Sequence, residues 1–105
     1  MKITDFEKHQ LSNAMQQYYD FKVNNLDAVV FFQLGDFYEM FFEDAIEVSK
    51  LLELTLTSKS AGLEEKVPMA GIPLSSLNEY VKRLMKFNKK VAIVEQDNES
   101  MESSK

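Results

Sequence analysis

A segment that combines aromatic and acidic residues is the first place in this chain where side chains could do chemistry. In GDFYEMFFEDA, residues 35–45, large apolar side chains stand beside four carboxylates. In an extended strand, alternation would place Phe37 and Glu39 on the side opposite Tyr38 and Met40. Aromatic residues at a strand–helix junction usually pack into a core, which we expect of Tyr38 and Met40. An exposed ring beside an exposed carboxylate would then remain, and such a ring indicates a binding role.

The same acids allow a second interpretation, a nuclease-like magnesium site. Its ligands would be drawn from Asp36, Glu39, Glu43, Asp44 and Glu95. Acids at the start of a helix are explained more simply as partners of the helix dipole, and no nuclease pattern of carboxylates with a lysine is recognisable. The chain has no cysteine and a single histidine, His9, so thiolate chemistry is excluded and zinc or histidine catalysis has almost no material. We therefore expect a protein that is not an enzyme and holds no metal or cofactor.

Charge is unevenly distributed along the 105 residues, a length that fits one domain. The net charge of −5 argues against a nucleic-acid binder. Residues 58–90, however, hold seven basic and three acidic side chains, so phosphate contacts should be sought there. Their densest cluster, which more often indicates a solvated face and is assigned no contact, is Lys82, Arg83, Lys86, Lys89 and Lys90. Neither a membrane span nor a signal peptide is recognisable.

Hydrophobic periodicity predicts the elements that must position these residues. Helices are expected over 13–24, after the N-cap Ser12, over 43–52, and from Ser75 or Ser76 to 87. Strands are expected over 28–34, 54–57 and 90–95, with a turn at 35–36, an exposed loop over 58–66 and a fixed non-helical connection over 68–73. This order predicts an α/β fold, a mixed and mostly parallel β-sheet flanked by helices. We expect one domain over residues 1–97 and a polar, disordered tail over 98–105.

Three motifs together resemble one known family. GDFYE is followed about thirty residues later by PMAGIP, and then by a helix and VAIVEQ. This combination is similar to domain I of the MutS family of DNA mismatch repair proteins, over about residues 14–96. The resemblance places the F-x-E motif of that family on Phe37-Tyr38-Glu39. It implies that Phe37 enters the minor groove and stacks on a mispaired base, while Glu39 hydrogen-bonds to that base.

The resemblance also implies supporting contacts and shows departures. Ser58, Lys59 and Lys66 would lie on phosphates, with Pro68 and Met69 near the groove, although a solvated loop and a packing turn remain open at each position. The family often has Lys-Arg where this chain has Ser58-Lys59, and usually Tyr-His where it has Leu74-Ser75. The sequence holds no GxxxxGK[ST] loop. ATP and magnesium are therefore expected only of full-length members.

Physical chemistry supports a mismatch reader. An inserted ring must unstack a base step, which costs a few kcal/mol, and costs less where pairing is already lost. Glu39 could accept from a base N–H, or could take up a proton beside the polyanion and donate; we favour the second for bases that present only acceptors. The expected partner is double-stranded DNA with mismatches or small unpaired loops, without membrane contact, in the cytoplasm at the nucleoid. The alternative is a truncated interaction protein that modulates MutS-type proteins without strong DNA binding.

Overall fold

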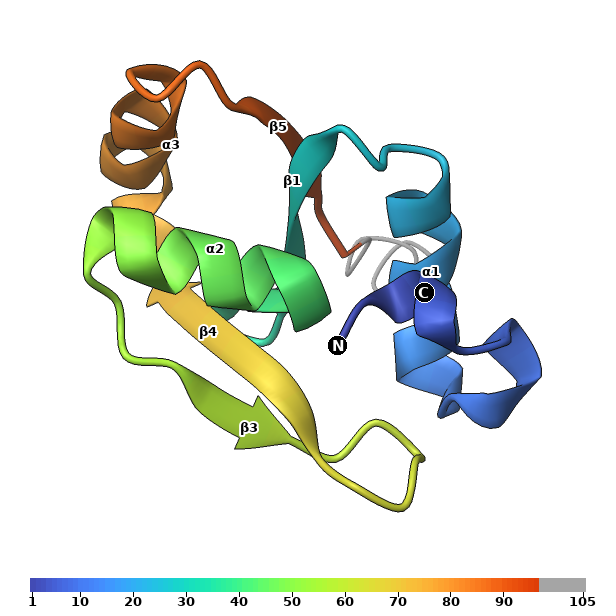
Figure 1. Cartoon of the computed structure of the whole chain (residues 1–105). Coiled ribbons are helices and arrows are strands. Elements are labelled where there is room, and N and C mark those ends of the chain that lie inside the picture. Colours follow the sequence, from blue (N-terminus) through green and yellow to red (C-terminus); the bar gives the residue numbers. More distant parts are fainter. Residues whose placement is uncertain (97–105) are drawn as a thin grey trace, which may run out of the picture.

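The computed structural model describes residues 1–96, which form a five-stranded mixed sheet between two layers of helices. Its strand order is β3-β4-β2-β1-β5. The strands are β1 (Ala28–Leu34), β2 (Phe37–Phe41), β3 (Thr57–Lys59), β4 (Val67–Pro73) and β5 (Lys90–Val94). The helices are α1 (Asn13–Val23), α2 (Phe42–Leu52) and α3 (Leu77–Met85), with 3-10 turns η1 (Ile3–Asp5), η2 (Lys8–Gln10) and η3 (Leu74–Ser76). Figure 1 shows α1 on one side of the sheet and α2 in front of β4.

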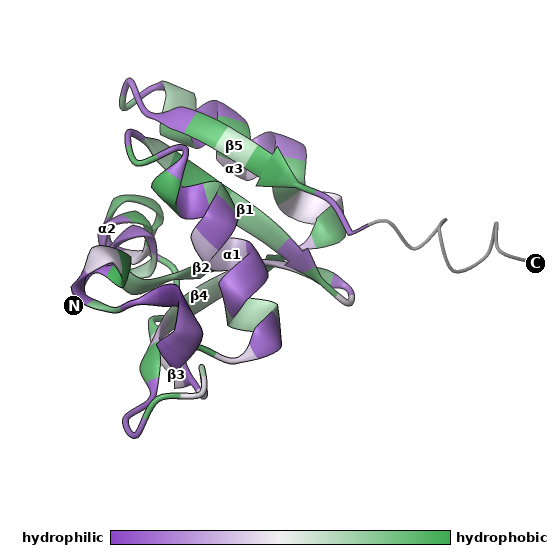
Figure 2. Ribbon diagram, turned by 90° about the vertical axis from the view of Figure 1, so that its right-hand side faces the viewer, coloured by the Kyte–Doolittle hydropathy of each residue, from purple (hydrophilic) through white to green (hydrophobic). Residues whose placement is uncertain are grey.

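Burial on both faces explains why β1 reads as an almost continuous apolar run. Val30 and Phe32 pack on the side of α1, with the buried Met15 and Tyr18 of that helix. Their neighbours on β1 point the other way, into the cluster formed with α2 and α3. Figure 2 shows β1 and β5 as mainly apolar strands beside the more polar α1. The mixed α/β architecture with flanking helices is thus confirmed.

The predicted predominance of parallel strands is wrong. Within the described residues only β1 and β5 pair in parallel, whereas β1–β2, β2–β4 and β3–β4 are antiparallel. The cause is a hairpin that the sequence reading did not separate from the first strand. Leu34 pairs with Phe37, so Gly35 and Asp36 form a two-residue turn. Gly35 has a φ of 60°, the left-handed conformation that such a hairpin turn requires and that glycine adopts without a steric cost.

Two further element predictions need correction. The strand expected over 54–57 lies at Thr57–Lys59 instead, because Glu53 ends α2 in a left-handed conformation and the Leu54 N–H still caps the helix on the Ser49 carbonyl, at 3.0 Å. The segment 68–73, expected to be a connection, is the interior strand β4. Its two prolines stand near the ends of the strand, so the four residues between them keep their N–H groups for the sheet.

The remaining elements follow the sequence closely. The Ser12 hydroxyl accepts from the Met15 N–H at 3.4 Å, which confirms the predicted N-cap of α1. The first strand has the predicted bounds, and α2 and β5 begin or end within one residue of them. The third helix is divided into η3 and the shorter α3. The expected tail over 98–105, and residue 97, lie outside the described residues.

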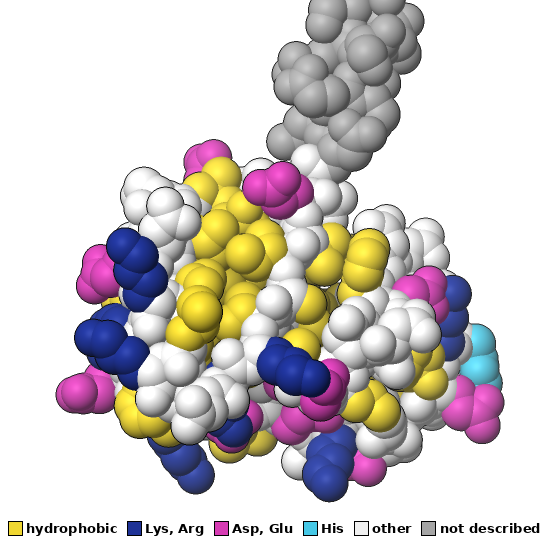
Figure 3. Space-filling model, turned by 90° about the horizontal axis from the view of Figure 1, so that it is seen from above, with side chains coloured by type: hydrophobic (Ala, Val, Ile, Leu, Met, Phe, Trp, Pro, Cys, Tyr) yellow, Lys and Arg dark blue, Asp and Glu magenta, His cyan; other side chains and the backbone are white. Residues whose placement is uncertain are grey.

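One side of the molecule keeps apolar groups at its surface. The face of α3 has a regular apolar stripe, yet only Leu84 on this helix is buried. Met85 is 62% exposed, Phe87 49% and Ile93 of β5 43%. Figure 3 views the molecule from the side of α3 and β5 and shows hydrophobic side chains gathered there. Within residues 1–96, no helix combines the length and the apolar content needed to cross a membrane.

A buried ion pair joins both helical layers to the sheet. Lys22 of α1 and Asp44 of α2 are 2% and 4% exposed, and their charged groups lie 2.9 Å apart. The Lys22 ammonium also donates to the Ala28 carbonyl at 2.6 Å, while Asp44 accepts from the Val30 N–H at 2.9 Å. Burial raises the pKa of Asp44, and the Val30 amide and Lys22 oppose that rise.

Tyr18 completes this network. Its hydroxyl donates to the Phe41 carbonyl at 3.2 Å and lies 3.5 Å from Asp44. Burial and the carboxylates of Asp44 and Glu43 raise the pKa of Tyr18 well above its usual value, so the hydroxyl keeps its proton. Among the described residues, no buried side-chain nitrogen or oxygen lacks a hydrogen-bond partner. The polar groups of the core are therefore satisfied, as stable burial requires.

Lys22→Met should lower the free energy of unfolding by about 3–5 kcal/mol, because it leaves the Asp44 carboxylate buried without its cation. Urea denaturation followed by circular dichroism measures this change. The matched control is Lys90→Met, since Lys90 holds Asp27 at 2.8 Å on the surface, where an ion pair contributes little. Lys22→Met combined with Asp44→Asn should be less destabilised than Lys22→Met alone. Equal losses from Lys22→Met and Lys90→Met would contradict this role.

Candidate functional site

Phe37 and Glu39 lie on a part of the sheet that no helix within residues 1–96 covers completely. The alternation predicted for β2 is confirmed for three residues: Phe37 is 47% exposed, whereas Tyr38 and Met40 are 4% and 0% exposed. The predicted exposure of the carboxylate is wrong, because the Glu39 side chain is only 12% exposed and is paired with Lys59. Phe37 opens the strand directly after the tight turn at residues 35–36. Its ring therefore projects at one end of the sheet, where Glu39 follows it on the same face.

Tyr38 and Met40 anchor β2 from the opposite face. Both belong to the apolar cluster that α2 and α3 cover. The Tyr38 hydroxyl donates to Glu95 at 3.3 Å, and burial together with the Glu95 carboxylate raises the pKa of Tyr38. The buried side chains of Tyr38 and Met40 thus fix the position of β2, and with it the positions of Phe37 and Glu39.

Strand register decides which of the other predicted contacts share this face. Glu39 pairs with Gly71, and Met69 pairs with both Phe41 and Thr57. Phe37, Glu39 and Met69 line a hollow of about 280 Å³, together with three residues that the sequence reading missed: Thr55, Thr57 and Gly71. Thr55 and Thr57 were predicted in the strand over 54–57 and Gly71 in the connection over 68–73. The pairing of β3 and β2 with β4 brings Thr57 and Gly71 to the face of Glu39.

Gly71 keeps this hollow open. A Cβ atom at this position would lie 3.5 Å from the Cγ of Glu39 and 3.9 Å from the sulfur of Met69. A larger side chain would occupy the space between them. At Gly71 the hollow is thus lined by backbone, beside Glu39 and the half-exposed ring of Phe37.

Lys59 reaches this site, whereas three of the other predicted residues do not join it. The Lys59 ammonium lies 2.9 Å from Glu39 and 5.9 Å from the centre of the Phe41 ring. Ser58 and Pro68 are paired with each other, one residue out of step with Lys59 and Met69, so their side chains project to the opposite face. Lys66 lies in the exposed segment before β4. The predicted DNA contacts therefore lie in three places: Lys59 and Met69 on the sheet face of Glu39, Ser58 and Pro68 on the opposite face, and Lys66 in the loop before β4.

The basic cluster of the third helix is partly engaged within the protein. Lys89 pairs with Glu47, and Lys90 with Asp27. Arg83 stacks on the ring of Tyr80, 5.1 Å from its centre. Three of the five basic side chains of this cluster are thus engaged with neighbouring residues of the protein.

The carboxylates considered for magnesium are dispersed. Asp44 is bound to Lys22, Glu39 to Lys59, and Glu43 accepts the Ile3 N–H at 3.1 Å. Within residues 1–96, no three or more His, Cys, Asp or Glu side chains are grouped as a metal ion would need.

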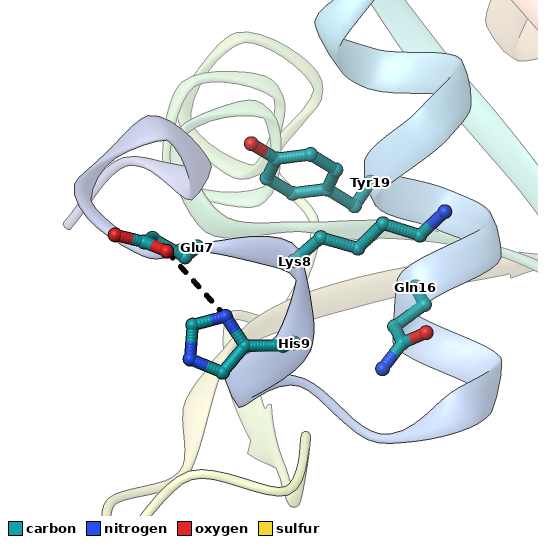
Figure 4. Close-up of a pocket in the computed structure, with 5 residues that line it drawn as sticks. All are labelled: Glu7, Lys8, His9, Gln16 and Tyr19. Atoms are coloured by element: carbon teal, nitrogen blue, oxygen red, sulfur yellow. Dashed lines mark ion pairs between the residues drawn. The ribbon is translucent and has the colours of Figure 1, made fainter.

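A hollow at the N-terminal turns is a less suitable site. It has a volume of about 470 Å³ and is lined by Glu7, Lys8, His9, Gln16 and Tyr19. Figure 4 shows the side chains of Glu7 and His9 pointing toward each other. The distance between Glu7 Oε2 and His9 Nδ1 is 3.4 Å. Lys8 pairs with Asp20 at 2.9 Å. The charged groups at this hollow are thus engaged with one another or with a neighbour.

Comparison with known proteins identifies the family. The family model "MutS domain I" matches residues 12–105. The chain belongs to the MutS family. It is 50% identical over 90 residues to the DNA mismatch repair protein MutS of Clostridioides difficile, with 86% of this chain and 10% of that protein covered. It is 55% identical over 82 residues to the MutS of Lysinibacillus sphaericus and 54% identical over 82 residues to that of Bacillus subtilis, with 78% of this chain and 10% of each relative covered.

These matches confirm the family resemblance and define its extent. The chain spans about a tenth of the length of these MutS proteins. The matched part is domain I, which is not the ATPase domain of the family. A five-stranded mixed sheet flanked by helices is consistent with a MutS domain I.

The two sides of β2 should respond differently to truncation. Phe37→Ala should change the free energy of unfolding by less than about 1 kcal/mol, because Phe37 is 47% exposed and is not part of the buried core. Met40→Ala should cost about 2–5 kcal/mol, since it leaves a cavity in the core. Urea denaturation of both variants measures the difference. A loss from Phe37→Ala as large as that from Met40→Ala would show that Phe37 is a core residue.

Proposed function

We propose that this chain binds mismatched or distorted double-stranded DNA, inserting Phe37 at the mispaired base while Glu39 hydrogen-bonds to that base. The observation that carries the proposal is an exposed phenylalanine beside a carboxylate, on an uncovered sheet face of a MutS domain I. The relatives named above are DNA mismatch repair proteins. The role is recognition without catalysis, and the reading step itself uses no cofactor.

The energetics favour damaged or mispaired sites over regular duplex. Inserting the Phe37 ring unstacks a base step at a cost of a few kcal/mol. A mismatch or a small unpaired loop has already lost part of its stacking and pairing, so insertion costs less there. Recognition then depends on deformability, which suits a reader that must accept several mismatches. We place this activity in the cytoplasm, at the nucleoid.

Supporting contacts come from the neighbouring strands and loop. Met69 lies beside Phe37 in the same hollow, where it can contact the groove. Lys66, exposed before β4, is suited to a phosphate. Ser58 and Pro68 face the other way, so their part in binding would need a DNA path around the edge of β3. With few phosphate contacts, the affinity should fall only gradually as salt rises, because the slope is proportional to the number of phosphates that the protein neutralises.

The decisive measurement is binding to matched and G·T-mismatched duplexes at low salt, by fluorescence anisotropy. Wild-type protein should prefer the mismatch, and Phe37→Ala should remove that preference. Phe87→Ala is the matched control, because Phe87 is 49% exposed against 47% for Phe37 and lies beyond the end of α3. Equal affinity for both duplexes in wild type, unchanged by Phe37→Ala, would refute the proposal.

Glu39→Gln tests how the carboxyl group reads the base. Where the edge of the mispaired base that faces residue 39 presents only acceptor atoms, the glutamine amide can donate as a protonated glutamic acid would. The preference for mismatched over matched duplex should therefore largely persist. Glu39→Ala should lose it, since no donor is left. If preference collapses in Glu39→Gln as completely as in Glu39→Ala, the site requires a carboxylate.

A second candidate function is an interaction module that modulates MutS-type proteins without strong DNA binding of its own. The apolar surface formed by Met85, Phe87 and Ile93 favours it, because large exposed apolar groups invite contact with another protein. Capture of a full-length MutS protein by a chain that shows no affinity for either duplex would favour this candidate over the first.

A further inference from the structure

Gly71 lies between the two walls of the hollow beside Phe37, and its missing side chain determines the shape of that hollow. It pairs with Glu39 of β2, which forms one wall together with Phe37. The exposed Thr55 and Thr57 form the other wall, before and at the start of β3. Because β4 lies between β2 and β3 in the sheet, the hollow is a trough along β4 (the Gly71 trough).

Neither the backbone nor the packing of β4 requires a glycine at this position. Unlike the turn residue Gly35, Gly71 does not have a positive φ. A Cβ atom would lie 3.4 Å from the Tyr38 carbonyl oxygen and 3.5 Å or more from its other neighbours, which are ordinary van der Waals distances. A glycine inside a strand is less favourable than an alanine, because it loses more conformational freedom on folding. The residue therefore weakens the strand without a gain in the fold.

A glycine inside a strand often marks a place where a ligand approaches the backbone closely, and the Gly71 trough is open to such an approach. Gly71 itself is partly exposed. Any side chain larger than that of alanine would project into the space between Glu39 and Met69, the nearest side-chain neighbours of its Cβ position. The missing side chain thus leaves a path for a ligand along β4, next to the half-exposed ring of Phe37.

The chemistry of the walls suits the sugar–phosphate backbone of DNA. Threonine hydroxyls can donate to phosphate oxygens, and contacts of this kind position a protein on DNA without reading its sequence. The thioether of Met69 offers an apolar surface to the C–H groups of a deoxyribose. An extended peptide fits less well, because it adds to the free edge of a sheet, whereas β4 has a paired strand on each side.

We propose that the Gly71 trough is a binding subsite for the deoxyribose–phosphate backbone of the DNA strand next to the base step that Phe37 opens. The inference rests on the proposed function and deepens it. It assigns a role to Gly71, Thr55 and Thr57, to which the sequence motifs gave none. Gly71 contributes through the space that it leaves, and the threonines contribute their hydroxyl groups. Because the trough adjoins the inserted ring, it is occupied when Phe37 is inserted.

A size series at residue 71 tests the space, by fluorescence anisotropy of the full chain on matched and G·T-mismatched duplexes at low salt. Gly71→Ala should stay folded, with a urea midpoint equal to or above that of wild type, because its Cβ fits and alanine is favoured over glycine in a strand. Its affinity for the mismatched duplex should fall by about fivefold or more, since the added methyl group is overpacked against the bound strand. Gly71→Val should bind this duplex more weakly still.

A hydroxyl deletion tests the other wall. Thr57→Val keeps the shape of the side chain and removes its donor, so the affinity for the mismatched duplex should fall by about two- to tenfold. The matched control is Thr4→Val, the same substitution at an exposed threonine of η1, outside the trough. This control should keep the wild-type affinity. In a Phe37→Ala background, Gly71→Ala should cause no further loss, because the ring no longer brings the strand to the trough.

Three outcomes would overturn the inference alone. One is full affinity for the mismatched duplex in both Gly71→Ala and Thr57→Val. Another is a loss of affinity in Gly71→Ala that accompanies a lower urea midpoint, since the glycine would then serve the fold. The third is an undiminished effect of Gly71→Ala in the Phe37→Ala background, which would separate the trough from the inserted ring. Equal binding of matched and mismatched duplexes by wild type would instead overturn the proposed function, and this inference with it.

Discussion

The arrangement of this domain depends on the polar network at the place where β1 and β2 stop pairing with each other. Strands β1 and β2 pair from the turn as far as Phe32 and Glu39. Beyond that point β2 pairs only with β4, as far as Phe41, and then continues into α2. Two residues before Phe32 on β1, the Val30 N–H donates a hydrogen bond to the Asp44 carboxylate, whose charge is balanced by Lys22. Helices from opposite layers are thereby joined at the open end of the hairpin. Because that end is held by a buried and fully bonded network, the closed end can present Phe37 from a rigid support.

Coverage by helices then decides where a ligand can approach. On one face, α2 and α3 bury Tyr38, Met40 and their neighbours. On the other face, α1 packs over β1, and the end of β2 with β3 and β4 remains open around Glu39 and Gly71. The candidate site is therefore the part of the sheet that the helices of residues 1–96 leave open. It consists of side chains on strands, which hold their directions more firmly than side chains on a loop would.

The features predicted correctly from sequence are those set by local patterns. Burial on both faces gave β1 its apolar run, Ser12 marked the start of α1, and alternation separated Phe37 from Tyr38. Features set by pairing between distant segments were missed. Pro68 and Pro73 indicated a connection, yet they lie near the two ends of an interior strand. Lys59 was predicted to lie in a loop, yet it belongs to β3 and pairs with Val67 of β4. The ion pair between Lys59 and Glu39 joins residues on non-neighbouring strands, so no periodicity in the chain could reveal it.

The two-residue turn at Gly35 and Asp36 also constrains how the gene can change. Successive side chains of a strand alternate between faces, so a shift of β2 by one position exchanges every inward residue with an outward one. One inserted or deleted codon between Leu34 and Phe37 would direct Tyr38 and Met40 to the solvent and turn Phe37 and Glu39 into the core. A carboxylate would then be buried in an apolar cluster. We therefore expect the spacing of this turn to tolerate substitutions far better than changes in length during evolution.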